Sequence, residues 1–463
     1  MNFEDRIDRR TKPNRTSKIE PSTWLSYATP GRRFPGLGNM LLIKNARILD
    51  PAASRDEVGD LLIQNGLIAD SNGPIPDEAE TVDARGLWLA PGFWDIHVHL
   101  REPGGEEAET IASGSASAVQ GGFTTIVGMP NTTPALDTPE RVAFVLEQGE
   151  KTDLARIHTT GCITRGRAGC ELAPLSELAE AGAIAFTDDG CTVPDDNLLR
   201  KAMETARDLD LPIMDHAQDS ELEKRGVMHE GEYSRKHELP GIPSLAEERI
   251  VARDATLAVE TGCRFHIQHI TSGGSVRFLD EARAAGARIT GELTPHHLAL
   301  CDAAIDPKDA NYKMNPPLRS PDDRNRLTRA LLEGHIEIFA TDHAPHTEAE
   351  KARGFLKAPF GVLGLETAVG LTYSLLVKTG RMEALDWVSR WTTGPAGILG
   401  LPAPGLSKGS PADLVLIDPR LEWVVDSNTF VSKSRNTPFN GWKLTGRPIR
   451  TIRDGRTVWK RSP

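Results

Sequence analysis

Short runs of apolar residues alternate with amphipathic stretches through the middle of the chain. Eight of these runs have the length and composition of buried strands, and each is followed by a segment of helical character, such as 198–210. The strand-like runs are 93–100, 123–131, 156–163, 183–190, 212–218, 263–272, 287–297 and 336–345. Consecutive strand–helix units of this number predict an α/β protein built on a (β/α)8 barrel of the TIM type.

The two ends of the chain have a different pattern. Residues 40–90 and 405–463 consist of short strand-like runs separated by turn signals such as Asn65–Gly66. They predict one small β-sandwich domain made from both termini, over 40–92 and 400–463, with the barrel over 93–399 between them. Residues 1–39 show no periodic apolar pattern, and we expect a flexible N-terminal extension there.

Charge and composition exclude several classes of function. The 463 residues carry a formal net charge of −11, which argues against the basic face that a nucleic-acid partner requires. No apolar run approaches the ~20 residues of a membrane span, so we expect no membrane partner. The five cysteines are widely spaced without a CxxC pair, which is typical of reduced thiols in a cytoplasmic protein.

Polar residues that bind metals stand at the ends of the predicted barrel strands, where the active sites of such barrels lie. They are His97, His99, Asp188 or Asp189, His216, His269 and Asp342. His97 and His99 share one face of their strand because side chains alternate along a strand. From the spacing alone, Asp188 and Asp189 are almost equally good candidates.

Four imidazoles and two carboxylates suit Zn²⁺, with Mn²⁺ or Co²⁺ as substitutes. Six ligands exceed what a single tetrahedral zinc uses while it keeps a position open. Two zinc ions that share a carboxylate would use the whole set, although one ion remains an alternative. Such a site is locally positive and would attract an anionic substrate despite the acidic composition.

The motifs around these positions closely resemble those of dihydroorotases, over about residues 40–463. They are GFWDIHVHLREPG, GGFTTIVGMPNTTP, FTDDG, MDHAQD, HIQHITSGGS, ELTPHHL, NYKMNPPLRS and ATDHAPH. The resemblance implies a zinc-dependent cyclic amide hydrolase. Its reaction is the reversible cyclisation of N-carbamoyl-L-aspartate to (S)-dihydroorotate and water in pyrimidine (UMP) biosynthesis.

The resemblance also implies roles for individual residues. One metal would bind His97, His99, Asp189 and Asp342, and the other Asp189, His216 and His269. Asp189 would stand where many relatives have a bridging carboxylated lysine, and Asp342 would be the catalytic acid and base. The implied substrate-binding residues are Arg101, Asn131 and His346 for the carboxylate, Asn315 for the ring, and the backbone of Phe360 and Gly361. Segment 347–361 is interpreted as a mobile loop over the barrel mouth.

Alternatives and further expectations complete the prediction. The nearest enzyme alternative is a hydantoinase or allantoinase, which normally carries the bridging lysine. A different alternative is an inactive homologue that scaffolds aspartate carbamoyltransferase, but such proteins typically lose metal ligands. We expect a homodimer, and a complex with aspartate carbamoyltransferase remains open. His296 and His297 are interpreted as mainly structural, and His229 and His237 as solvated.

Overall fold

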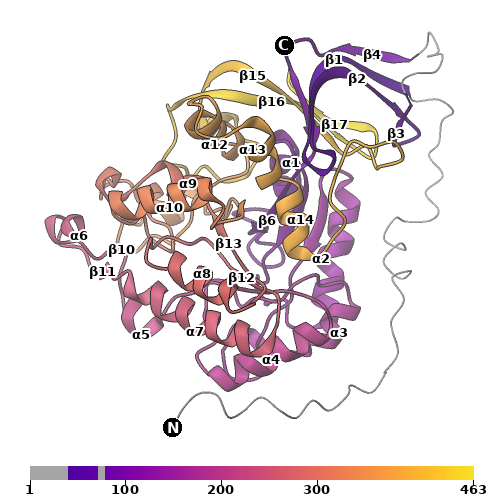
Figure 1. The fold of residues 1–463 in the computed structure, drawn as a ribbon. Coiled ribbons are helices and arrows are strands. Elements are labelled where there is room, and N and C mark those ends of the chain that lie inside the picture. Colours follow the sequence, from indigo (N-terminus) through magenta and orange to yellow (C-terminus); the bar gives the residue numbers. More distant parts are fainter. Residues whose placement is uncertain (1–39, 71–78, 463) are drawn as a thin grey trace, which may run out of the picture. The chain divides into compact units, whose positions relative to one another are not determined.

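The computed structural model describes residues 40–70 and 79–462. The flexible extension predicted for residues 1–39 lies outside the described residues. Two kinds of architecture are seen in the described part: a sheet made from both ends of the chain, and a barrel of parallel strands covered by helices (Figure 1). The predicted fold class is therefore confirmed. The residue boundaries proposed between the two domains stay a prediction.

An eight-stranded sheet joins the two ends of the chain. Its order is β17-β16-β15-β5-β1-β2-β3, with β4 paired to β1 as a side branch. The strands are β1 (Met40–Asp50), β2 (Arg55–Gln64), β3 (Leu67–Ala69), β4 (Glu80–Asp83), β5 (Trp88–Pro91), β15 (Leu414–Val424), β16 (Lys443–Arg453) and β17 (Arg456–Lys460). The antiparallel pair β5–β15 links the N-terminal strands to the C-terminal ones, over Leu414↔Pro91 to Ile417↔Trp88.

The barrel strands run parallel and are short. They are β6 (Phe93–Val98), β7 (Phe123–Gly128), β8 (Arg156–Thr159), β9 (Ile213–Asp215), β12 (Phe265–Ile267), β13 (Ile289–Leu293) and β14 (Ile338–Phe339). The fourth predicted strand, 183–190, forms only isolated bridges, from Phe186 to Gly161 and to Ile213. It still connects β8 to β9, and the bridge Val98↔His343 closes the ring.

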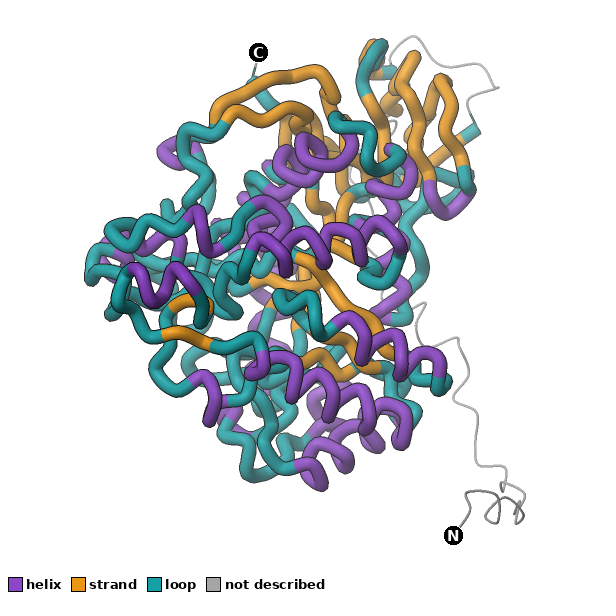
Figure 2. The backbone as a smooth tube through the Cα atoms, turned by 60° about the vertical axis from the view of Figure 1, so that its left-hand side comes forward, coloured by secondary structure: helices purple, strands orange, loops and turns teal. Residues whose placement is uncertain are grey.

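Helices cover the outside of these strands (Figure 2). The longer ones are α1 (Ile111–Gln120), α2 (Pro139–Thr152), α4 (Asp196–Asp208), α7 (Leu245–Thr261), α8 (Val276–Ala284) and α10 (Pro321–Glu333). The shorter ones are α3 (Leu175–Glu180), α5 (Ser220–Glu223), α6 (Glu232–Lys236), α9 (Pro295–Ala299), α11 (Glu348–Lys351), α12 (Ala368–Thr372), α13 (Ala384–Arg390) and α14 (Thr393–Leu399). Among the described residues, no helix is long and apolar enough to span a bilayer.

Aromatic residues fill the barrel where its strands begin. Phe93 and Phe123 are the first residues of β6 and β7, and both are fully buried. The ring of Trp391, just before α14, lies 5.3 Å from that of Phe123 and 5.1 Å from that of Phe339. Such large apolar side chains dominate the energetics of a core. The amino-terminal end of the barrel strands is therefore packed with aromatic side chains, and the polar residues lie at the carboxyl ends.

The long loop after β9 differs from its prediction. It carries a two-stranded sheet of β10 (Met228–His229) and β11 (Gly241–Ile242). His229, interpreted as solvated, is in fact only 8% exposed and lies 3.5 Å from the guanidinium of Arg319. His237 is half-buried. The prediction for His229 is wrong because the loop folds back on the strand ends instead of extending into water.

Candidate active site

The predicted metal ligands converge at the carboxyl ends of the barrel strands. His97 lies in β6, and Asp189 lies near the end of the fourth segment, 183–190. The others lie within three residues of a strand end: His99 after β6, His216 after β9, His269 after β12 and Asp342 after β14. All six side chains are buried. Parallel strands end at the same pole of a barrel, so residues far apart in the sequence meet there.

Asp189 lies at the centre of this cluster. One oxygen, Oδ1, is 3.3 Å from Nε2 of His97, and the other, Oδ2, is 3.5 Å from Nε2 of His99. The same carboxylate faces His216 and His269, with Oδ1 4.0 Å and 3.9 Å from their nearest ring nitrogens. Two possible metal-binding groups result, His97–His99–Asp189 and Asp189–His216–His269, and Asp189 belongs to both.

Asp342 completes the first of these groups. Its Oδ1 atom lies 2.9 Å from Nε2 of His99 and 3.6 Å from Nε2 of His97. The backbone of Asp342 has φ 47°, and that of His269 has φ 30°. Residues other than glycine rarely adopt positive φ, and they concentrate at functional sites, where surrounding structure sustains the strain.

The structure separates Asp188 from Asp189. Asp188 turns away from the histidines, and its carboxylate accepts hydrogen bonds from the backbone N–H groups of Ile163 and Thr164 and from the Thr164 hydroxyl. Asp189 alone faces the cluster. The chain spacing did not distinguish the two because consecutive residues at a strand end point in opposite directions, and only the neighbouring segment determines which points inward.

The electrostatics of the cluster follow from burial and charge together. Burial opposes ionisation of Asp189 and Asp342, but the surrounding imidazoles, His97 first, outweigh it and hold both pKa values below the ordinary carboxyl value. Burial lowers the pKa of His269 to about 3 and also lowers that of His216. The carboxylates are thus ionised and these two imidazoles neutral, which are the protonation states that metal binding requires.

Glu292, the fourth of the five residues of β13, was not predicted as a site residue. Its carboxylate lies 2.6 Å from Nδ1 of His97 and 3.0 Å from Nε2 of His266, and it accepts a hydrogen bond from the backbone N–H of His269. Burial opposes its ionisation, but the histidines, His97 first, lower its pKa to about 2. The available signal was an acidic residue within a buried strand, since unpaired charges are rarely buried.

The predicted substrate-binding residues line one side of the cluster. Asn131 lies 2.9 Å from Nδ1 of His99 through its Oδ1 atom and donates to Asp189 through its Nδ2 atom. The Nδ2 atom of Asn315 is 3.3 Å from Nε2 of His216, while its Oδ1 atom is buried and has no hydrogen-bond partner within residues 40–70 and 79–462. Both amides therefore touch candidate ligands, and Asn315 has an acceptor to spare.

Arg101, His346 and the backbone at Phe360–Gly361 form a second part of this wall. Arg101 donates to the carbonyl of Pro345 and lies 3.3 Å from Nε2 of His346. His346 in turn is 2.6 Å from the carbonyl oxygen of Phe360. A Cβ atom at Gly361 would lie 2.9 Å from the His346 ring, at φ 145°, so only glycine fits there. Phe360 and Gly361 are connected to Arg101 through His346.

His296 and His297 follow β13 and are both buried. His297 has a partner for each ring nitrogen: the Thr294 hydroxyl at 2.7 Å and the carbonyl oxygen of Pro316 at 3.0 Å. These contacts agree with a structural role for His297. The Nε2 atom of His296 is buried without a hydrogen-bond partner among the described residues.

Comparison with known proteins decides the family. A family model described as dihydro-orotase-like matches residues 86–275. The chain is 45% identical to a dihydroorotase from Geobacillus sp. (strain WCH70), covering 91% of this chain and 99% of the relative. A dihydroorotase from Bacillus cereus (strain B4264) is 44% identical over 91% of this chain and 98% of the relative. The chain belongs to the dihydroorotase family.

The fold of this dihydroorotase-family chain is similar to that of solved hydantoinase structures. L-hydantoinase (dihydropyrimidinase) from Arthrobacter aurescens superposes with a TM-score of 0.81 at 25% identity, over 91% of this chain and 96% of that structure. This likeness covers nine-tenths of the chain. It confirms the fold class, while the higher identity with dihydroorotases determines the family.

The donors of this dihydroorotase-family site fit a divalent metal. Three ionised carboxylates, those of Asp189, Asp342 and Glu292, gather around buried imidazoles, and their charge raises the pKa of His97 well above its ordinary value even though burial opposes it. A cluster this rich in buried negative charge needs a cation. Imidazole and carboxylate donors suit zinc and related transition metals. The residues present therefore fit a metal centre.

Proposed function

We propose that this protein is a metal-dependent dihydroorotase, which interconverts N-carbamoyl-L-aspartate and (S)-dihydroorotate with release or uptake of water. The observation that carries the proposal is the position of Asp189, one buried carboxylate shared by the pairs His97–His99 and His216–His269. Dihydroorotases from two bacteria at 44–45% identity over nine-tenths of the chain support the choice of substrate.

The proposed cofactor is Zn²⁺, with two ions per chain, and Asp189 would be a ligand of both. His97, His99, Asp189 and Asp342 would hold one ion, and Asp189, His216 and His269 the other. When bound, zinc lowers the pKa of a water molecule to near neutrality and polarises the scissile carbonyl. The aspartate carries the same single negative charge as a carboxylated lysine, and it needs no carbon dioxide to form.

Asp342 is the proposed general acid and base. Its pKa lies below the ordinary value, so it is ionised and ready to accept a proton from the attacking water. It would then pass this proton to the ring nitrogen that leaves. In the biosynthetic direction the same carboxyl group would take the proton from the carbamoyl nitrogen as the ring closes.

The wall of Arg101, Asn131 and His346 is the proposed binding site for the substrate carboxylate. A guanidinium presents parallel N–H groups that match a carboxylate. Burial lowers the pKa of His346 to about 3, and the nearby charge of Arg101 lowers it further. The imidazole ring is therefore neutral, and Arg101 carries the positive charge that would face the substrate carboxylate. Asn315 would contact the ring, and the backbone of Phe360 and Gly361 would complete the pocket.

This wall distinguishes the proposal from its enzyme alternative. Dihydroorotate carries a ring carboxylate, whereas hydantoin and allantoin do not. A half-buried arginine would remain without an anion when such a neutral ring is bound, which costs binding energy. We therefore expect dihydroorotate to be preferred over hydantoin and allantoin. The presence of all six candidate metal ligands argues against the other alternative, an inactive scaffold protein.

The deciding experiment measures metal content and turnover in the same samples. Zinc per chain and the rate of dihydroorotate hydrolysis are measured before and after chelation, with hydantoin and allantoin as control substrates. We expect bound zinc, loss of activity on chelation and recovery on addition of Zn²⁺. Full activity in metal-free protein, or equal turnover of hydantoin, would contradict the proposal.

Adjacent residues provide a matched test of the bridge. Asp189→Asn removes the shared charge and should lower activity at least about a hundredfold and reduce bound zinc. Asp188→Asn keeps a side chain of the same size at the neighbouring position and should retain its zinc. The choice of Asp189 is wrong if the Asp189→Asn protein keeps full activity and metal content.

Assembly and location complete the proposal. A homodimer, an association with aspartate carbamoyltransferase and a cytoplasmic location all remain predictions. The five cysteines are free thiols, in agreement with a reducing compartment. Sedimentation of the purified protein alone and with the transcarbamoylase tests the first two.

A further inference from the structure

Two separate segments of the chain contribute Asn315 and Phe360–Gly361 to the proposed substrate site, and neither belongs to a long helix or strand. One is 310–315, which ends at Asn315, and the other is 356–361, which carries Phe360 and Gly361. Their backbones meet at one hydrogen bond, from the N–H of Gly361 to the carbonyl of Lys313. A single bond of this kind contributes only about 1 kcal/mol, so further contacts must hold the wall in place.

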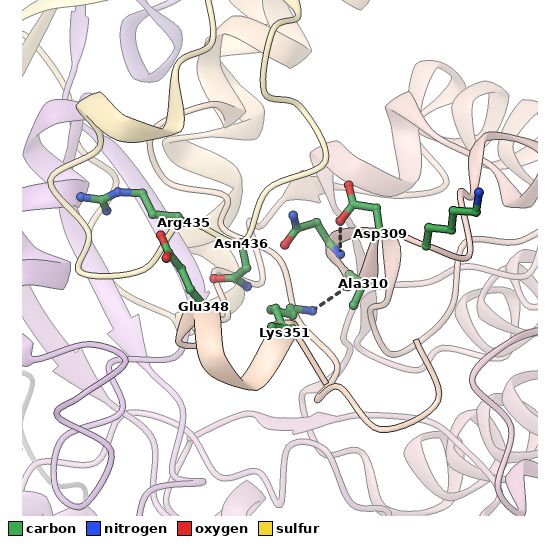
Figure 3. Close-up of a pocket in the computed structure, with 9 residues that line it drawn as sticks. Asp309, Ala310, Glu348, Lys351, Arg435 and Asn436 are labelled. Carbon is green, nitrogen blue, oxygen red and sulfur yellow. Dashed lines mark hydrogen bonds between the residues drawn. The ribbon is translucent and has the colours of Figure 1, made fainter. Parts of the chain in front are cut away.

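Lys351 provides three of these contacts. It is the last residue of α11, and its side chain is buried, with 8% of the residue exposed. Its Nζ atom donates to the carbonyl oxygens of Ala310 at 3.0 Å, Lys313 at 3.1 Å and Pro359 at 3.0 Å. An ammonium group has three N–H donors, and all three are used. The bond to Ala310 is drawn in Figure 3, where the Lys351 side chain points toward that residue.

Lys313 makes the complementary connection. It is buried on segment 310–315, and its Nζ atom donates to the carbonyl oxygens of Leu356 at 3.2 Å and Ala358 at 2.7 Å. The same atom lies 4.5 Å from the centre of the Phe360 ring, which is a cation–π distance. Lys351 therefore binds backbone carbonyls of both segments and Lys313 binds those of 356–361, so that five hydrogen bonds join α11, 310–315 and 356–361.

These contacts are at odds with a freely mobile loop over 347–361. Both lysines are buried, and this burial lowers the pKa of Lys351 to about 7 and that of Lys313 to about 8. Charged groups this buried are retained only when acceptors surround them. Here the acceptors are backbone carbonyls, whose positions the lysines in turn determine.

We propose that Lys351 and Lys313 are positioning residues for the substrate, because they hold Asn315 and the Phe360–Gly361 backbone at a constant separation. The substrate named in this inference rests on the proposed function. The five hydrogen bonds by which Lys351 and Lys313 join the two segments, called the clamp below, do not. The lysines do not touch the candidate metal ligands in any described contact. Their loss should therefore weaken substrate binding and leave the metal centre in place.

The first test replaces each lysine by methionine, which keeps the long apolar stem and removes the ammonium. For Lys351→Met and Lys313→Met we expect KM for dihydroorotate to rise at least about tenfold, with a smaller fall in kcat and unchanged zinc per chain. Trypsin cleavage after the exposed Arg353 should accelerate about tenfold, because the segment is released. Lys357→Met, an exposed lysine of the same segment, should keep the wild-type KM.

A second test uses chemical rescue. Lys351 lines a surface cavity of about 360 Å³ together with Asp309, Glu348 and Asn436 (Figure 3). Lys351→Ala opens space beside this cavity, and n-propylamine supplies the missing ammonium. Added amine should lower the raised KM of this variant and slow its cleavage after Arg353, while the wild-type protein should not respond.

The outcomes separate the clamp from the proposed function. Wild-type KM and cleavage rate in Lys351→Met and Lys313→Met would overturn the clamp, as would loss of zinc together with activity. Loss of cooperative unfolding in both variants would also overturn it, because the lysines would then support the whole barrel. If the wild-type protein fails to hydrolyse dihydroorotate, the proposed function is wrong, but the cleavage rates still decide whether the lysines hold this segment.

Discussion

At the scale of single residues, the site is organised by carboxylates that reach several partners at once. Asp189 faces four histidines, and Glu292 contacts His97, His266 and the backbone of His269. Because Glu292 occupies Nδ1 of His97, the Nε2 atom of that ring is left to face Asp189. Partners of this kind fix the tautomer and orientation of metal-binding imidazoles and increase their basicity. Glu292 is thus part of the site without being a candidate ligand.

Glu292→Gln tests this role. The amide keeps the size of the side chain but removes the charge, so His97 loses its strongest partner. We expect zinc affinity to fall about 10–100-fold, measured by competition with a chelator, and activity to return at high zinc concentration. Glu281→Gln, an exposed change on α8, is the control. An unchanged zinc affinity would show that Glu292 does not orient His97.

At the scale of elements, the barrel strands are mostly apolar, and polar side chains lie at or just beyond their carboxyl ends. Seven of the eight predicted runs contain an observed strand, and the fourth, 183–190, forms only isolated bridges. The strands themselves are shorter: the run 263–272 yields only β12, Phe265–Ile267. The hydrophobic pattern overestimates strand length because residues beyond the last paired residue, such as His269 at positive φ, line the barrel mouth and are as buried as the strand itself.

The aromatic residues at the opposite pole should matter for stability and not for chemistry. Trp391→Ala removes a fully buried ring in contact with Phe123 and Phe339 and should lower the free energy of unfolding by about 3–5 kcal/mol. Zinc per folded chain should stay unchanged. Denaturant titration measures the loss, and Trp459→Ala on the half-buried β17 should cost less. Equal costs would show that the ring cluster contributes no special stability.

At the scale of the whole molecule, the two chain ends are tied together through β5 and β15, and buried groups couple stability to pH. Burial lowers the pKa of His297 and of His229 to about 4 from an ordinary value of 6.5. A histidine whose folded pKa is lowered binds its proton more readily in the unfolded chain. Its contribution to stability is complete above pH 6.5 and is lost as the pH falls toward 4.

The free energy of unfolding should therefore fall through this window, by up to about 1.4 kcal/mol per pH unit for each such histidine. His297→Gln removes one titrating group and should reduce the slope, although it lowers stability at neutral pH by loss of the contacts to Thr294 and Pro316. Urea unfolding at the two ends of the window gives the slope, with the half-buried His237→Gln as control. An identical slope in His297→Gln would contradict the assignment.

The sequence by itself determined the fold class, the family and the identity of the residues that converge at the barrel mouth. Strand periodicity and the position of polar residues at strand ends are local properties, and they predicted the fold class and the converging residues. The family followed from the resemblance of the motifs around these residues. Strand spacing left Asp188 and Asp189 open, and the resemblance to dihydroorotases pointed to Asp189. Only the tertiary structure showed that Asp188 turns away from the histidines, that Glu292 contacts His97, and that Lys351 and Lys313 join two loops. Each of these depends on atoms contributed by a distant segment, and backbone carbonyls, the acceptors for both lysines, are the same at every residue and leave no trace in a sequence.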